Sequence, residues 1–193
     1  MFDRPLRLIS AAVAATLLVW PAQAQTVVQE SGFWAAEVAK GQMDPAAERI
    51  PDTPLIVDLE AKGRTFGSQG GTLRTMVTRS KDVRQMVVYG YARLVGYDHE
   101  YKLAPDILRD FEVEEGRIFT LHLRPGHRWS DGAPLTSADF EYWWKHVANN
   151  AELNPNGPPE IMRSGGVATM TFPDDLTVVV EYPEANPRFL PAL

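Results

Sequence analysis

The chain has 193 residues, a formal net charge of −6, no cysteine, and ordinary globular proportions of 45% hydrophobic and 23% charged residues. The absence of cysteine excludes disulfides, thiolate metal sites and thiolate chemistry, so we expect stability to come from burial alone. The acidic balance argues against nucleic acid or an anionic membrane surface as a partner.

The first 24 residues are predicted to be a signal peptide. Arg4 and Arg7 form a short basic region, and the apolar run at 8–20 has about two-thirds of the ~20 residues that a membrane-spanning helix needs. An Ala-Gln-Ala site then predicts cleavage after Ala24. No cysteine is available for lipid attachment, so we expect a periplasmic protein that is not inserted in the membrane. An uncleaved anchor is the alternative.

Residues 25–67 are predicted to be an N-terminal extension. Short helices are expected at 33–40 and 44–49, the second opening with an Asp-Pro pair. Two prolines then frame an apolar patch at 55–57. We expect this part to lie as a strap on the surface of the main domain.

The main domain is predicted to begin near residue 68. A Gly-Gly-Thr-Leu motif at 70–73 predicts a turn and a strand to residue 77, and no Gly-Lys-Ser/Thr or G-x-G-x-x-G follows to make it a phosphate loop. A polar loop at 78–82 leads into an expected helix at 83–94. Residues 111–123 then predict strand, turn and strand, since Phe119, Leu121 and Leu123 alternate with polar residues.

A second helix is predicted after two turns, at Pro-Gly 125–126 and Ser-Asp-Gly 130–132. Thr136 fits an N-cap, with Asp139 three residues on. The helix carries one apolar face, made of Phe140, Trp143, Trp144 and Val147. A hairpin follows, with strands at 167–172 and 176–182 around Pro-Asp-Asp. Hairpins and separate helices together predict a mixed α/β (α+β) fold.

These turns and the helix start also carry a resemblance. The segment resembles the signature region of the extracellular solute-binding proteins of family 5, the peptide-binding subunits of ABC importers. The matching residues are Leu123-Arg124-Pro125-Gly126, Trp129-Ser130-Asp131-Gly132, Pro134, Thr136, Asp139 and Phe140. The Gly-Gly-Thr-Leu motif and the stretch at 186–190 are similar to two further landmarks of this family.

The resemblance implies a two-lobed binding protein of which residues 68–193 form the N-terminal part of lobe I. Lobe II would then be absent and the chain would be an N-terminal fragment, in which nothing follows the apolar residues Phe189, Leu190 and Leu193 for them to pack against. The implied function is the periplasmic substrate-binding component of an ABC transporter, which captures peptides or similar small solutes by lobe closure and delivers them to permease subunits. Neither a cofactor nor catalysis is expected. An exported hydrolase and a standalone interaction module are the alternatives.

The resemblance also implies a ligand-binding loop, because the loop after the first core strand lies at the interlobe cleft in this family. Here that loop is Thr78, Arg79, Ser80 and Lys81. Arg79 and Lys81 could pair with a peptide carboxylate, and Ser80 or the backbone could bond its main chain. The alternative is a polar loop that caps the following helix through Ser80 or Asp82.

No catalytic or metal site is predicted. The four histidines, His99, His122, His127 and His146, show no metal-binding spacing. Ser130 and Asp131 lie near His127, but no G-x-S-x-G elbow accompanies them. Trp143 and Trp144 could form a stacking platform, although their shared helix face favours core packing.

Overall fold

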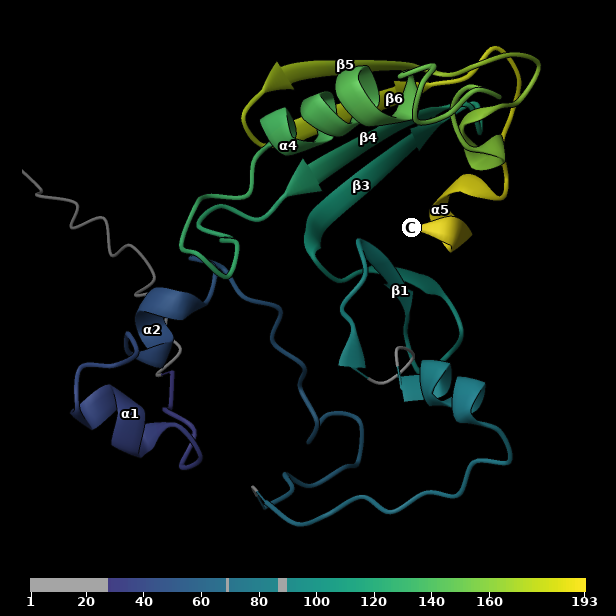
Figure 1. Ribbon diagram of the computed structural model, residues 1–193. Coiled ribbons are helices and arrows are strands. Elements are labelled where there is room, and N and C mark those ends of the chain that lie inside the picture. Colours follow the sequence, from purple (N-terminus) through teal and green to yellow (C-terminus); the bar gives the residue numbers. More distant parts are fainter. Residues whose placement is uncertain (1–27, 69, 87–89) are drawn as a thin grey trace, which may run out of the picture.

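The computed structural model describes residues 28–193 except 69 and 87–89. Its centre is a four-stranded antiparallel sheet in the order β3-β4-β6-β5 (Figure 1). The strands are β3 Leu108–Glu114, β4 Ile118–Leu123, β5 Thr169–Asp174 and β6 Thr177–Glu181. Both predicted hairpins are therefore confirmed. The predicted signal peptide, residues 1–24, lies outside the described residues.

The sheet has one apolar and one polar face. In the strand register, Phe111 of β3 lies opposite Leu121 of β4, and Leu121 lies opposite Val178 of β6. The burial of β4 alternates, with Phe119, Leu121 and Leu123 all at most 3% exposed, as the period-2 pattern predicted. The mixed α/β prediction is confirmed, because the apolar face packs against helices and the other face carries polar side chains.

The predicted second helix lies against this apolar face, where α4 (Ser137–Tyr142) contacts β5 and β6. Its start is as expected, since the Thr136 backbone N–H donates to Asp139 Oδ2 at 2.8 Å. From Trp143 the helix widens into the π-helical turn η2, Trp143–Ala148, so the 3.6-residue period is not maintained. Phe140, Trp143 and Trp144 nevertheless pack on the core, as predicted.

The C-terminal residues also join this core. After η3 (Glu160–Met162) and β6, the short helix α5 (Phe189–Ala192) returns to the sheet. The Phe189 ring is 2% exposed and lies 4.8 Å from the Phe119 ring, centroid to centroid. Phe189 and Leu190 therefore pack on residues that precede them, among which are Tyr182 nearby and Phe119 far earlier in the chain.

The segment before the sheet is less regular than predicted. The helices α1 (Ala35–Ala39) and α2 (Ala46–Arg49) occur close to the expected positions. The strand expected at 72–77 does not form, because none of the described strands pairs with these residues. The helix expected at 83–94 forms only in part. Residues 80–85 are the 3-10 helix η1 (Ser80–Gln85), Met86 and Gly90 are α-helical, and residues 91–94 are not helical. A hairpin of β1 (Val95–Tyr97) and β2 (Leu103–Pro105) follows.

Candidate binding site

The predicted ligand-binding loop forms the start of η1. Arg79 occupies the N-cap position, and its backbone N–H donates to Asp82 Oδ2 at 3.1 Å. The Thr78 hydroxyl donates to the same oxygen at 2.9 Å. Asp82 therefore caps this turn from its third position, where a carboxylate also complements the partial positive charge of a helix start. The alternative expectation, a polar loop that caps the following helix, is therefore correct for Asp82. The Thr78 hydroxyl is already hydrogen-bonded to this carboxylate.

The other three groups of the loop remain free. Arg79, Ser80 and Lys81 are exposed, and their side chains make no hydrogen bond or ion pair with any described residue. Two cations and a hydroxyl thus project from a short, capped turn. This arrangement can bind a carboxylate or a carbonyl oxygen, and it offers no group that could act as a nucleophile with its own base.

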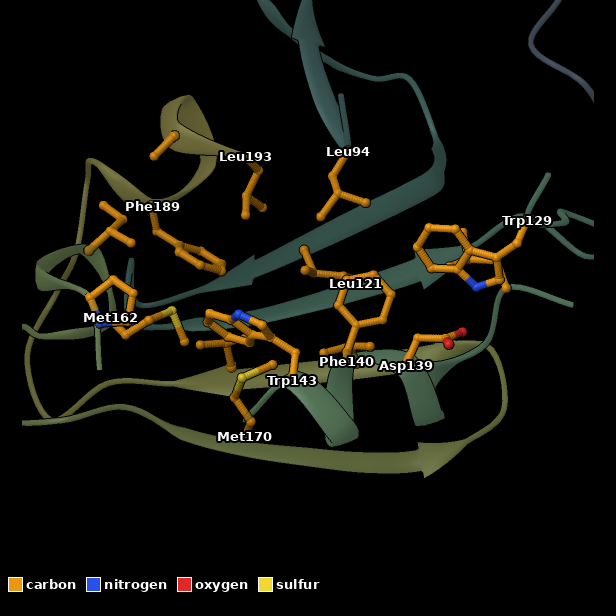
Figure 2. A pocket seen from close by; sticks show the side chains of 16 residues that line it. Leu94, Leu121, Trp129, Asp139, Phe140, Trp143, Met162, Met170, Phe189 and Leu193 are labelled. Carbon is orange, nitrogen blue, oxygen red and sulfur yellow. The ribbon is translucent and has the colours of Figure 1, made fainter. Parts of the chain in front are cut away.

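An apolar cavity of about 360 Å³ lies between the sheet and the helices (Figure 2). In Figure 2, the side chains of Phe140 and Trp143 lie next to Leu121, and Phe189 lies at the α5 side of the cavity. Asp139 is the one ionisable residue among the described lining, and its carboxylate already accepts the helix N-terminal N–H. The cavity therefore offers apolar contact and no reactive group. Trp143 belongs both to the core and to this cavity wall.

The candidate catalytic and metal residues do not assemble into a reactive site. Within the described part of the chain, no hydrogen bond joins Ser130 to His127, and Asp131 accepts the Ala133 N–H within its own turn at 2.9 Å. On the polar face of the sheet, His122 Nε2 lies 3.6 Å from Asp110 Oδ1 and 3.7 Å from Glu112 Oε1. Among the described residues, no group of three or more His, Asp or Glu side chains is placed to hold a metal ion.

The turn after β4 binds the N-terminal extension. The Arg124 side chain is 8% exposed and donates from Nη1 to the Thr53 carbonyl at 2.9 Å and from Nε to the Asp106 carbonyl at 3.1 Å. The Asp52 N–H donates to the Pro125 carbonyl at 3.0 Å. We call this set of bonds the clamp. It confirms, for residues 52 and 53, the prediction of a strap lying on the main domain.

Gly126 completes the clamp because its position admits no side chain. Its φ of +77° is in the left-handed region, and a Cβ there would lie 2.6 Å from Asp52 Cγ and 2.9 Å from the Asp52 backbone nitrogen. Sequence reasoning placed Arg124 and Gly126 in the signature turn but did not identify what they bind. Their partners in the extension, Thr53 and Asp52, lie 71 residues or more earlier in the chain, so no local signal marks them.

Ser137 is a further residue whose role was missed. Its side chain is 5% exposed, and its Oγ–H donates to the Asp174 carbonyl at 2.6 Å. Its backbone N–H donates to the Asp175 carbonyl at 2.8 Å. These bonds attach the start of α4 to the turn between β5 and β6, which explains a small hydroxyl residue directly after the N-cap.

Residues 102–193 match the profile of the bacterial extracellular solute-binding proteins, family 5 Middle. The solved structure of an oligopeptide-binding protein OppA superposes with a TM-score of 0.71 at 30% identity, over 86% of this chain and 25% of that one. The chain belongs to the family 5 solute-binding proteins.

Two curated relatives show how the family varies. OppA of Escherichia coli (strain K12), a periplasmic oligopeptide-binding protein, is 33% identical over 137 residues, which are 67% of this chain and 24% of that protein. A periplasmic alpha-galactoside-binding protein of Rhizobium meliloti (strain 1021) is 25% identical over 178 residues, which are 80% of this chain and 25% of that protein. The chain thus spans about a quarter of the length of these relatives. Within the described residues, every helix is too short or too polar to cross a membrane.

Proposed function

We propose that this chain is part of the periplasmic substrate-binding component of an ABC importer, which captures a peptide or a similar small solute. The observation that carries the proposal is the agreement with the OppA structure over 86% of the chain. The relatives named above bind oligopeptides or alpha-galactosides, so a solute with several polar groups is the common expectation. We infer that the protein acts by binding, with no chemical step, and hands its solute to permease subunits of the importer.

The proposed division of the chain is a signal peptide at 1–24, an extension at 25–67 and the first part of lobe I at 68–193. In this arrangement the Thr78–Lys81 loop contributes one wall of the interlobe cleft, and closure of the second lobe would complete the site. Arg79 and Lys81 are the cations that would meet a solute carboxylate. Their exposure and lack of partners in the described structure support this role.

Calorimetric titration of the complete gene product tests the proposal. Tri- to hexapeptides and an alpha-galactoside would be titrated, and solute released from the purified protein would be identified by mass spectrometry. Saturable binding of one solute class is expected. Hydrolysis of peptide or ester substrates by the same preparation would contradict it and favour an exported hydrolase.

The loop has its own test. Arg79→Ala is expected to weaken solute binding while leaving the melting temperature nearly unchanged, because the side chain is exposed and makes no bond. Arg84→Ala is the matched control, since it removes another exposed, unpaired cation from the same 3-10 helix. Equal affinities for the two variants would remove the loop from the site.

A further inference from the structure

The apolar cavity between the sheet and the helices has the dimensions of a small-molecule site. Its volume of about 360 Å³ falls within the ~300–1,000 Å³ that such pockets occupy. Leu121 of β4, Phe140 of α4 and Trp143 of η2 line its body. The Thr78–Lys81 loop contributes no residue to the described lining, so the cavity is separate from the proposed solute site.

One end of this cavity is both charged and open to water. Figure 2 shows the Trp129 ring and the Asp139 carboxylate at this end, away from Phe189. Trp129 is 52% exposed and Asp139 is half-buried, so this end reaches the solvent. A guest with a polar head and an apolar body can therefore keep its head here while the body lies in the apolar part of the cavity.

Asp139 sets the sign of the charge at this end. Its Oδ2 accepts the Thr136 N–H at 2.8 Å, and a carboxylate keeps its negative charge in such a bond. Its Oδ1 bonds to no described residue. The described lining contains this one Asp and no Glu, Lys, Arg or His, so its formal charge is −1.

The charged residues next to Trp129 in sequence leave this balance unchanged. Arg128 and Asp131 carry opposite charges, and neither lines the cavity. Both are bonded within their own turn, since Arg128 Nη1 donates to the Gly132 carbonyl at 3.0 Å and Asp131 Oδ1 accepts the Ala133 N–H at 2.9 Å. The carboxylate of Asp139 therefore dominates the charge that a guest in the cavity would meet.

Such a lining discriminates between guests by their charge. A neutral apolar guest would remove Asp139 Oδ1 from water without giving it a partner, which costs free energy. An anionic guest would add repulsion to this cost. An organic cation would instead form an ion pair with the carboxylate, and the face of the Trp129 ring attracts the same cation.

We propose that this cavity binds an organic ammonium ion that carries one positive charge and an apolar body. The ammonium group lies between Asp139 Oδ1 and the Trp129 ring, and the body packs against Leu121, Phe140 and Trp143. The binding is reversible, because the cavity offers no group that reacts with the guest. It stands apart from the proposed solute site and does not depend on it.

Isothermal titration calorimetry of the complete gene product tests the proposal with three guests that share an eight-carbon chain. Octyltrimethylammonium is the cation, 1-octanol the neutral guest and octanoate the anion, each used below the concentration at which it forms micelles. We expect saturable binding of the cation, weaker binding of 1-octanol, and binding of octanoate weaker than that of the cation by about tenfold or more. The order follows from the single negative charge of the lining.

Two variants locate the head group. Asp139→Asn removes the charge but keeps an oxygen that can accept the Thr136 N–H, so it should weaken binding of the cation about tenfold without weakening that of 1-octanol. Trp129→Leu should weaken binding of the cation about threefold through loss of the ring. Asp131→Asn is the matched control, because it neutralises a carboxylate outside the cavity, and it should bind the cation as the wild type does.

Three results would overturn the proposal. The first is absence of cation binding, which would show that another segment of the complete protein fills the cavity. The second is binding of octanoate as tight as that of octyltrimethylammonium. The third is equal affinity of Asp139→Asn and Asp131→Asn for the cation.

Discussion

The clamp can be tested with two glycines of the signature region, which share a positive φ but differ in whether a side chain would meet the strap, residues 50–64 of the extension. Gly126 and Gly132 both have positive φ, +77° and +88°. A Cβ on Gly126 would collide with Asp52, whereas a Cβ on Gly132 would meet nothing within 4 Å. Gly132→Ala therefore measures the cost of the backbone conformation alone, and Gly126→Ala measures that cost plus the cost of displacing the strap.

The expected magnitudes follow from these contacts. A left-handed conformation costs an alanine roughly 1–2 kcal/mol, and both variants should lose this amount of unfolding free energy. The Asp52 side chain can rotate away, but its backbone nitrogen can move only with the strap. Gly126→Ala should therefore also lose the Asp52–Pro125 hydrogen bond, worth about 1 kcal/mol. If the neighbouring bond from Arg124 to Thr53 is lost as well, a further ~1.5–3 kcal/mol follows, since its donor is charged.

Hydrogen exchange read by mass spectrometry is the suitable assay, because it reports the strap separately from the rest of the molecule. The Asp52 amide, which the clamp bonds to the Pro125 carbonyl, should exchange faster in Gly126→Ala and at the wild-type rate in Gly132→Ala. Adding Asp52→Ala to Gly126→Ala should relieve only part of the effect, since the backbone contact remains. Equal exchange of the Asp52 amide in the two glycine variants would refute the clamp.

Two further predictions concern the core and the helix start. Burial raises the pKa of Tyr182 to about 12; because the native state then keeps its proton longer than the unfolded chain, stability should hold below about pH 10 and fall as pH rises towards 12. Tyr182→Phe should lower the unfolding free energy at neutral pH by about 1 kcal/mol, because it removes the hydrogen bond to the Ile161 carbonyl. Its stability, followed by circular dichroism, should nevertheless fall less steeply than that of the wild type between about pH 10 and 12. An equally steep fall would contradict this assignment. Asp139→Ala should lower the unfolding free energy measured in urea by about 1 kcal/mol, because it removes the bond from the Thr136 N–H. The control, Glu141→Ala, removes only an exposed ion pair and should cost less than about 0.5 kcal/mol. Equal losses would argue against the cap.

The features predicted from sequence are those whose causes lie within a few residues. Alternation at 119–123 identified the buried face of β4, because a strand with one covered face must alternate. Thr136 and Asp139 identified the start of α4, because the cap bond joins residues three apart. The hairpin turns were equally local. In each case the pattern and its physical cause span the same short stretch.

The failures involve partners that lie far away in the chain. The strand expected at 72–77 has suitable residues, but a strand also needs a paired neighbour, which the local pattern does not reveal. Phe189 contacts Tyr182 nearby, but its packing on Phe119, far earlier in the chain, has no local signal. Arg124 follows a strand in which even-numbered residues face outward, which predicts exposure, yet it is 8% exposed because the strap covers it.

The most recognisable segment of the chain is therefore used for its own folding. Arg124 and Gly126 bind the strap, Asp139 caps a helix, and Ser137 attaches that helix to a neighbouring turn. All of these contacts join residues of the chain to one another. A scaffold held by such internal contacts is compatible with different solutes. Relatives named for oligopeptides and for alpha-galactosides both match this chain.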